Sequence, residues 1–269
     1  MTMKKEITSS NPEIFLDNVS FAYEQEVILK EITLAFEPGQ FYSVLGPNGC
    51  GKTTLLDLLI GHLKPDSGSV FLKGRELGAW SRKDIARTIA LVSQNYNINF
   101  PFTVEEVIMM GRHPWISRFS QPDERDMDKV KTIMARTGTD IFKDRKITAL
   151  SGGERQRCVF ARALCQDTPI LFLDEACSNM DISHTLRLLN FVKEEVIKEN
   201  RTVISVFHDI NLASIWSDQL IFMKQGRVAA AGTTAEVMDA AIIEDVFQVK
   251  THVAYNEYSQ ARQVCFKVD

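Results

Sequence analysis

The sequence predicts an α/β fold in which a mostly parallel sheet is flanked by helices, with an antiparallel β part and a helical subdomain added to it. The first observation is a set of continuous apolar runs, which are typical of buried parallel strands. These runs lie at Phe41–Leu45, Ile89–Ser93, Ile170–Leu173 and Val203–Phe207. The second observation is the helical pattern that separates them, such as Ile182–Lys198, because strand–helix alternation is the signature of a parallel sheet.

The antiparallel β part is expected over residues 13–37. Apolar and polar residues alternate there in short runs, and Pro38-Gly39 supplies a turn that ends them. Further along, Leu220–Met223 and Arg227–Ala230 predict a hairpin. The tail after Gly232 is short and mixed, and it is too small for a large independent domain.

The helical subdomain is expected over residues 95–165, approximately, where helical patterns interrupt the strand–helix alternation. Thr103–Glu106 has the pattern of a capping box. Asp123–Val130 begins a second, charged amphipathic helix whose pattern fades at Gly138. No linker or repeat divides the chain, so we expect one domain over residues 1–269 with this subdomain inserted in its core.

Composition excludes several functional classes. A net charge of −4 argues against a nucleic-acid partner bound through a broad basic face. No apolar run approaches the eighteen or so residues that span a bilayer, and the polar start at Met1–Glu6 leads into no secretion signal. The five cysteines are odd in number and show no C-x-x-C pair, which favours free thiols in a reducing compartment.

One glycine-rich segment, Gly46-Pro47-Asn48-Gly49-Cys50-Gly51-Lys52-Thr53, lies between an apolar run and the helical pattern of Thr54–Ile60. Its glycines let successive N–H groups face an anion, and the helix N-terminus adds partial positive charge. Lys52 would supply a full charge to the outer phosphates, and the Thr53 hydroxyl would be a ligand of Mg²⁺. The segment therefore predicts a nucleoside-triphosphate site in a phosphate-loop NTPase core.

Polar side chains follow three of the apolar runs. Asp174 and Glu175 end one run, His208 follows another, and Gln94 follows a third. An aspartate at such a place holds Mg²⁺, and a neighbouring carboxylate can orient or deprotonate water. Because parallel sheets bind ligands at the carboxyl ends of their strands, we expect Gln94, Glu175 and His208 to converge on one phosphate. Taken alone, His208 would be a structural histidine.

A second anion-binding helix terminus is expected at Leu150–Arg157. Ser151 is a typical N-cap, and Gly152 and Gly153 allow close backbone approach. The helical subdomain would hold this terminus away from the phosphate loop of the same chain. One chain would then carry two half-sites, and a second copy would complete each.

Two sets of aromatic residues allow two interpretations each. Tyr23 could stack on a purine or be a half-buried strand aromatic. The loop over Asn95–Phe102 carries aromatics that could face a partner or cover the core of this chain.

In order and spacing these motifs resemble the nucleotide-binding subunit of an ATP-binding-cassette (ABC) transporter, over essentially the whole chain. The resemblance implies that Gly46–Thr53 is the Walker A loop, Leu150–Gln156 the signature motif and Ile170–Asp174 Walker B. It also implies a head-to-tail dimer that sandwiches two ATP, each between one Walker A loop and the other copy's signature motif.

The resemblance assigns a role to each candidate residue. The implied catalytic residues are Lys52, Gln94, Glu175 and His208. The implied ligands of Mg²⁺ are Thr53, Gln94 and Asp174. The implied nucleotide-binding residues are Tyr23, Gly46, Pro47, Asn48, Gly49, Cys50, Gly51, Lys52, Thr53, Thr54, Ser151, Gly152, Gly153 and Asp181, the last residue of a D-loop at Ser178–Asp181.

Two departures from the family pattern stand out. Ala176-Cys177 follows the catalytic glutamate where the family commonly has Pro-Thr. Cys50 replaces the serine most often found in the loop, which places a thiol beside the nucleotide. We expect Lys52 and the helix terminus to lower the pKa of this thiol, and ATP to protect it from alkylation.

Three segments narrow the resemblance to importers of iron–siderophore, haem and cobalamin cargo: Phe100–Val104, Met110–Trp115 and His208–Ala213. This subgroup implies ATP hydrolysis for a separate transmembrane permease, indirectly a substrate-binding protein, and a place on the cytoplasmic face of a bacterial membrane. The alternatives are the ATPase of an exporter and a soluble cassette ATPase without a membrane partner. The choice among the three cargoes stays open.

Overall fold

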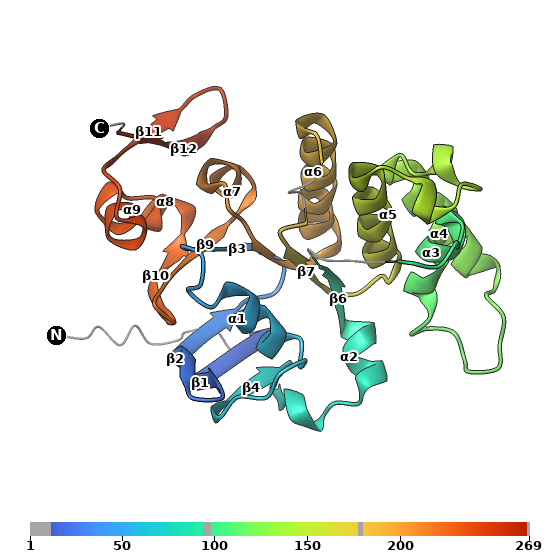
Figure 1. The fold of residues 1–269 in the computed structure, drawn as a ribbon, viewed down its shortest axis with the longest axis horizontal. Helices are drawn as coiled ribbons and strands as arrows, with labels where there is room; N and C mark the ends of the chain where they lie inside the picture. Colours follow the sequence, from blue (N-terminus) through green and yellow to red (C-terminus); the bar gives the residue numbers. More distant parts are fainter. Residues whose placement is uncertain (1–11, 94–97, 177–179, 268–269) are drawn as a thin grey trace. The chain divides into compact units, whose positions relative to one another are not determined.

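The computed structural model describes residues 12–93, 98–176 and 180–267. The chain forms two compact units (Figure 1). The first unit comprises residues 1–80 and 207–269, and the second comprises residues 81–206.

An antiparallel sheet opens the first unit. Its strand order is β2-β1-β4-β5, and its strands are β1 (Ile14–Tyr23), β2 (Glu26–Phe36), β4 (Ser67–Leu72) and β5 (Arg75–Glu76). Strands β1 and β2 pair over almost their whole length, which confirms the antiparallel strands predicted there. The 3₁₀ helix η1 (Leu77–Ala79) follows β5.

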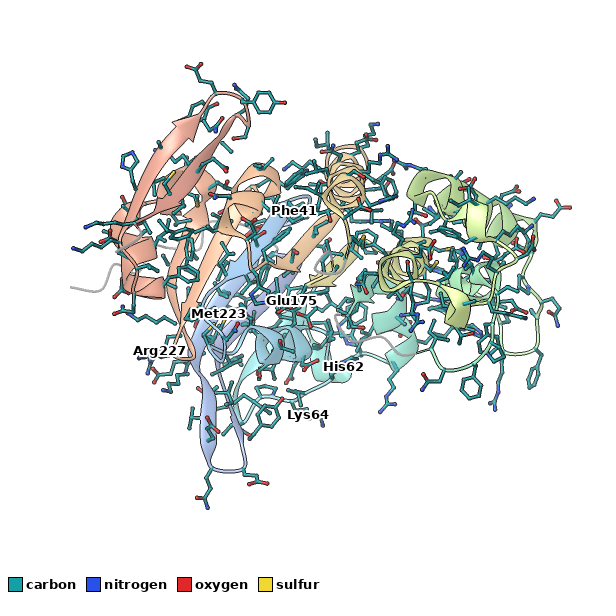
Figure 2. All side chains as sticks on the ribbon, turned by 45° about the horizontal axis from the view of Figure 1, so that its top comes forward. Phe41, His62, Lys64, Glu175, Met223 and Arg227 are labelled. Atoms are coloured by element: carbon teal, nitrogen blue, oxygen red, sulfur yellow. The ribbon has the colours of Figure 1, made fainter. Side chains whose placement is uncertain are left out.

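The rest of the first unit is built around β3 (Phe41–Leu45), all five residues of which are buried. Strand β3 is parallel to β9 (Gln219–Lys224), and β9 forms the predicted hairpin with β10 (Arg227–Thr233). Phe41 on β3 and Met223 on β9 are labelled in Figure 2. Helix α1 (Lys52–Leu59) begins directly after the glycine-rich segment.

The tail is more structured than its mixed pattern predicts. It contains α8 (Thr234–Val237), α9 (Ala240–Phe247) and an antiparallel hairpin of β11 (Thr251–Asn256) and β12 (Ala261–Phe266). The hairpin has a weak sequence pattern because β11 has no buried residue. Helix α7 (Ile210–Trp216), also not predicted, packs against β12.

The second unit contains three parallel strands in the order β8-β7-β6. They are β6 (Ile89–Val92), β7 (Ile170–Asp174) and β8 (Thr202–Val206), which confirms three of the predicted parallel strands. Helix α2 (Arg82–Thr88) precedes β6, and α6 (Ile182–Glu199) connects β7 to β8.

Helices occupy most of the stretch between β6 and β7. They are α3 (Val104–Met109), η2 (Met110–Arg112), α4 (Glu124–Thr137), η3 (Asp140–Phe142), η4 (Ile147–Ala149) and α5 (Gly152–Cys165). Helices α3, α4 and α5 pack on one another (Figure 1). Capping boxes start α3, α4 and α5, and Gly138 ends α4 in the left-handed conformation. These observations confirm the predicted capping box at Thr103–Glu106, the predicted N-cap at Ser151 and the predicted helix end at Gly138.

Among the described residues, no helix combines the length and the apolar character needed to cross a membrane.

Candidate active site

The glycine-rich loop closes because two of its positions have no room for a side chain. A Cβ on Gly46 would lie 2.3 Å from the backbone oxygen of Met223 on β9. A Cβ on Gly51 would lie 2.6 Å from a methyl group of Leu29 on β2. Both residues also have positive φ angles, which glycine adopts without strain. The backbone of β9 and a side chain of β2 therefore restrict the path of the loop that follows β3.

Helix α1 presents an open N-terminus to this loop. It is the one α-helix of the described ranges whose N-cap makes no side-chain hydrogen bond, and its first turn holds no acidic residue. The exposed Thr53 and the buried Thr54 lie in that turn. Unsatisfied N–H groups with the positive end of the helix dipole suit an anion such as a phosphate.

Lys52 places its charge over the loop. Its side chain is 7% exposed, and Nζ donates to the backbone oxygens of Gly46 at 2.8 Å and Pro47 at 3.1 Å. A buried ammonium group needs acceptors, and these two carbonyls supply them. Phosphate oxygens entering the loop would offer charged acceptors to the same group.

The pKa of the Cys50 thiol differs from the expected one. Its side chain is 3% exposed, and burial raises the pKa of the thiol although Lys52 acts in the opposite direction. The expectation that Lys52 and the helix terminus lower this pKa is therefore wrong, because desolvation of the thiolate is the larger effect.

Tyr23 lies on the sheet that contacts the loop. Its ring meets Phe21 edge-on at 4.9 Å, and Phe21 pairs with Leu29, the residue that touches Gly51. Tyr23 is 48% exposed, which leaves part of its ring accessible. Stacking on adenine stays a prediction for this residue.

His208 follows Phe207, which anchors it beside β3. The Phe207 N–H donates to the backbone oxygen of Val44 at 3.3 Å, and the Phe207 ring stacks on Phe41 with centroids 6.4 Å apart. His208 itself is exposed. The first unit thus contains the glycine loop, Lys52, Tyr23 and His208.

The second unit holds the acidic candidates. Asp174 ends β7 and Glu175, labelled in Figure 2, follows it; both side chains are half-buried. Glu175 has a φ angle of 47°, in the left-handed region that non-glycine residues rarely adopt. The buried Gln156 side chain on α5 donates to the backbone oxygen of Ala176 at 3.0 Å. This bond ties α5, which starts in the predicted signature motif and is called the signature helix below, to the residue directly after Glu175.

Ser151 caps the signature helix reciprocally with Glu154. The Ser151 hydroxyl accepts from the Glu154 N–H at 3.3 Å, and the Glu154 carboxylate accepts from the Ser151 N–H at 2.8 Å. Hydrogen bonds that the Glu154 carboxylate accepts from Ser151, the backbone N–H first among them, lower the pKa of Glu154. Ser151 and Gly152 stay exposed at the helix start, where another molecule can reach them.

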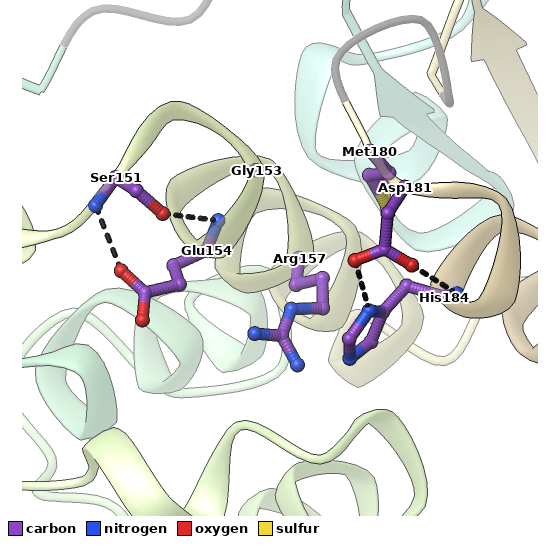
Figure 3. A pocket seen from close by; sticks show the side chains of 7 residues that line it. All are labelled: Ser151, Gly153, Glu154, Arg157, Met180, Asp181 and His184. Atoms are coloured by element: carbon purple, nitrogen blue, oxygen red, sulfur yellow. Dashed lines mark hydrogen bonds and ion pairs between the residues drawn. The ribbon is translucent and has the colours of Figure 1, made fainter.

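A pocket of about 100 Å³ brings Ser151 and Gly153 together with Asp181 (Figure 3). Its lining residues are Ser151, Gly153, Glu154, Arg157, Met180, Asp181 and His184. Asp181 caps α6: it accepts from the His184 N–H at 2.9 Å and lies 2.6 Å from His184 Nδ1. Hydrogen bonds from His184 and Ser183 hold the pKa of Asp181 well below its usual range, so this carboxylate is charged at neutral pH.

Some predicted residues lie outside the described ranges. These are Gln94, Cys177 and the first two D-loop residues, Ser178 and Asn179. Their roles stay predictions.

The importer-like segment at Met110–Trp115 packs largely within its own unit. A Cβ on Gly111 would lie 2.3 Å from a backbone oxygen of α5. Arg112 donates to Asp126 at 2.8 Å, and the Trp115 indole donates to the backbone oxygen of Gln166 at 2.6 Å. In the sequence, the segment served only to narrow the resemblance to importers, and its pattern did not predict these contacts of η2 with α4 and α5.

Of the aromatic loop, residues 95–97 lie outside the described ranges, and residues 98–102 have both buried and exposed apolar side chains. Ile98 is 8% exposed and covers the core, whereas Phe100 is 69% exposed and Phe102 is 38% exposed. The two phenylalanine rings lie 6.1 Å apart. Exposed neighbouring aromatics are typical of a contact surface.

A family model described as ABC transporter matches residues 29–178, more than half of the chain. The chain belongs to the ABC transporter family. This match confirms the resemblance to ABC transporter proteins that the sequence motifs indicated. The predicted α/β fold class is also confirmed.

Curated ABC relatives are import ATP-binding proteins. The petrobactin import ATP-binding protein YclP of Bacillus subtilis is 32% identical, with 86% of this chain and 91% of the relative covered. The iron(3+)-hydroxamate import ATP-binding protein FhuC of the same organism is 33% identical, with 94% of each covered. The cobalamin import ATP-binding protein BtuD of Halobacterium salinarum is 39% identical over 84% of this chain, which spans 56% of that relative's length.

Solved ABC structures share the fold. An inward-facing structure of a metal-chelate type ABC transporter matches with a TM-score of 0.82 at 23% identity, covering 96% of this chain and 98% of that one. The dimeric post-hydrolysis ATP-binding cassette MJ0796, bound to ADP and Pi, matches with a TM-score of 0.73 at 27% identity. That match covers 82% of this chain and 98% of the cassette.

The raised pKa of Cys50 predicts slow alkylation. At pH 7, a maleimide should label the exposed Cys265 well before Cys50, because little Cys50 thiolate is present, and raising the pH should speed the labelling of Cys50. Burial raises the pKa of Cys158 and Cys165 to about 12, so these two should stay unlabelled. Peptide mass spectrometry over a time course measures each rate. Labelling of Cys50 as fast as Cys265 at pH 7 would contradict the structure.

Proposed function

We propose that this chain is the ATP-hydrolysing subunit of an ABC importer that powers uptake of an iron chelate (siderophore), haem or cobalamin through a separate permease. The observation that carries the ATPase proposal is the loop between β3 and α1, with its two crowded glycines, its uncapped helix and the Lys52 ammonium group. These features together suit a nucleoside triphosphate.

The proposed ligands of Mg²⁺ have the donor chemistry that this ion prefers. The Thr53 hydroxyl is exposed at the start of α1, and Asp174 ends β7 with a carboxylate; both are oxygen donors that Mg²⁺ prefers. Gln94 is the third proposed ligand. When bound, Mg²⁺ would offset the charge that develops on the outer phosphates.

In the proposed hydrolysis, each candidate side chain has a separate role. Glu175 orients or deprotonates the attacking water, and His208 contacts the γ-phosphate. Lys52 balances the charge of that phosphate. The exposed Ser151 at the start of α5 serves the ATP held by another copy, and Asp181 borders the same pocket. Each proposed site therefore needs two copies of the chain.

The importer assignment rests on the relatives and on one surface. The relatives import petrobactin, iron(3+)-hydroxamate and cobalamin by name. In the second unit, a groove of about 320 Å³ is lined by Phe102, Glu106, Met109, Met110, His113, Ile116, Ser120, Gln121 and Pro122. We assign this largely apolar groove to a permease segment on the cytoplasmic face of a bacterial membrane. A substrate-binding protein would act on the other side.

Replacing Glu175 with glutamine tests the hydrolysis proposal. Glu175→Gln removes the base but keeps the shape, so ATP binding should persist and an ATP-dependent dimer should accumulate, while turnover falls by roughly 10² to 10⁴. Phosphate release, nucleotide binding and size-exclusion chromatography measure the three effects. The matched control is Glu199→Gln, an exposed glutamate on α6 that should leave turnover intact. Wild-type turnover in Glu175→Gln would rule out the assigned role.

Copurification from mildly solubilised membranes tests the permease proposal. The wild-type chain should retain a multi-spanning permease, identified by mass spectrometry, and Phe102→Glu should lose it because a charge enters the apolar groove. The control is Ile141→Glu, which puts the same charge on a residue that is 72% exposed outside the groove. Equal retention by both variants would place the permease elsewhere.

A further inference from the structure

The hairpin β11–β12 has no part in the proposed hydrolysis, yet it is joined to the helix that follows His208. Strand β12 packs on α7 in the first unit. The inner side of the contact is apolar, with Ala261 and Val264 of β12 and Ile210 and Ala213 of α7 all buried.

The Asn211 side chain adds two hydrogen bonds that fix how β12 lies against α7. Its side-chain oxygen accepts from the Val264 N–H at 2.7 Å, and its side-chain nitrogen donates to the Val264 backbone oxygen at 3.2 Å. The amide group thus pairs with both backbone groups of one strand residue, as a neighbouring strand would. Gln263 adds a bond in the same place, donating to the Ser214 hydroxyl at 2.9 Å.

The contacts continue from α7 to His208. Asp209 caps α7, its carboxylate accepting from the N–H groups of Asn211 at 2.8 Å and Leu212 at 3.0 Å. His208 precedes this cap and follows Phe207, which is hydrogen-bonded to β3 through Val44. The backbone of His208 is therefore held from one side by β3 and from the other by α7.

We propose that Asn211 is a positioning residue for hydrolysis: it locks α7 to β12 and so fixes the approach of His208 to the γ-phosphate. The inference rests on the proposed function, in which His208 contacts that phosphate. It gives the C-terminal hairpin a place in the catalytic apparatus.

The hairpin has attachments that do not involve Asn211. Arg262 donates to the backbone oxygen of Met238 at 3.2 Å, and the Thr251 N–H donates to Glu244 on α9 at 2.7 Å. Removing the Asn211 amide therefore loosens α7 on the hairpin without releasing the hairpin from the unit. Because the hairpin keeps these other attachments, the effect of losing the Asn211 bonds can be measured in the full chain.

The test compares ATP turnover in Asn211→Ala, Asn211→Asp and Asn256→Ala. Asn211→Ala should lower kcat about 10-fold, because misplacing a catalytic group by about 1 Å has effects of this order or larger, and should leave the KM for ATP and Tm nearly unchanged. Asn211→Asp keeps the acceptor for Val264 and should retain more activity. Asn256→Ala is the control: the Asn256 side chain accepts from the Tyr258 and Ser259 N–H groups within the hairpin turn, so its hydrogen bonds are local to that turn. It should keep wild-type kcat.

A double-mutant cycle with His208→Ala separates positioning from a general loss of structure. If Asn211 acts through His208, adding Asn211→Ala to His208→Ala should lower kcat no further. Wild-type kcat in Asn211→Ala, or an undiminished 10-fold loss in the His208→Ala background, would overturn the inference. Absence of ATP turnover in the wild-type chain would instead overturn the proposed function.

Discussion

The close approach of Gly46 to strand β9 is the constraint on which the phosphate loop depends. With the Met223 oxygen only 2.3 Å from where a Cβ would be, the backbone turns against β9 without a side chain between them. Helix α1 starts with an uncapped N-terminus because its N-cap, Gly51, has no side chain, and the Gly46 and Pro47 oxygens accept hydrogen bonds from Lys52. The positive character of the loop comes from the Lys52 ammonium group and the helix N-terminus, and the packing of Gly46 sets where the backbone around them runs.

The second unit contains the acidic candidate residues and the signature helix. The buried bond from Gln156 to Ala176 joins the signature helix to the end of β7, and the Asp181 pocket joins it to the start of α6. A shift of α5 would therefore act on the residues around Glu175 and Asp181 together. This linkage offers a physical route by which ATP bound at Ser151 of one copy would affect the carboxylates of the same copy.

Local signals in the sequence predicted much of this architecture. The capping box of α3 and the N-cap Ser151 of α5 depend on residues close together in the sequence, so a short window suffices to find them. The phosphate loop is likewise a continuous motif. The pairing of Asn211 with Val264 joins residues 53 positions apart, and no local pattern marks it. Burial of the Cys50 side chain raises the pKa of its thiol. The sequence showed the neighbouring Lys52, which acts in the opposite direction, but it did not show the burial.

In the proposed dimer, each ATP site combines the phosphate loop of one copy with the signature helix of another. Mixing two inactive variants, Lys52→Ala and Ser151→Arg, tests this arrangement most directly. A mixed dimer would contain one site with both defects and one with neither, so ATP turnover should reappear on mixing. Turnover that stays at the sum of the two separate variants would contradict a shared site.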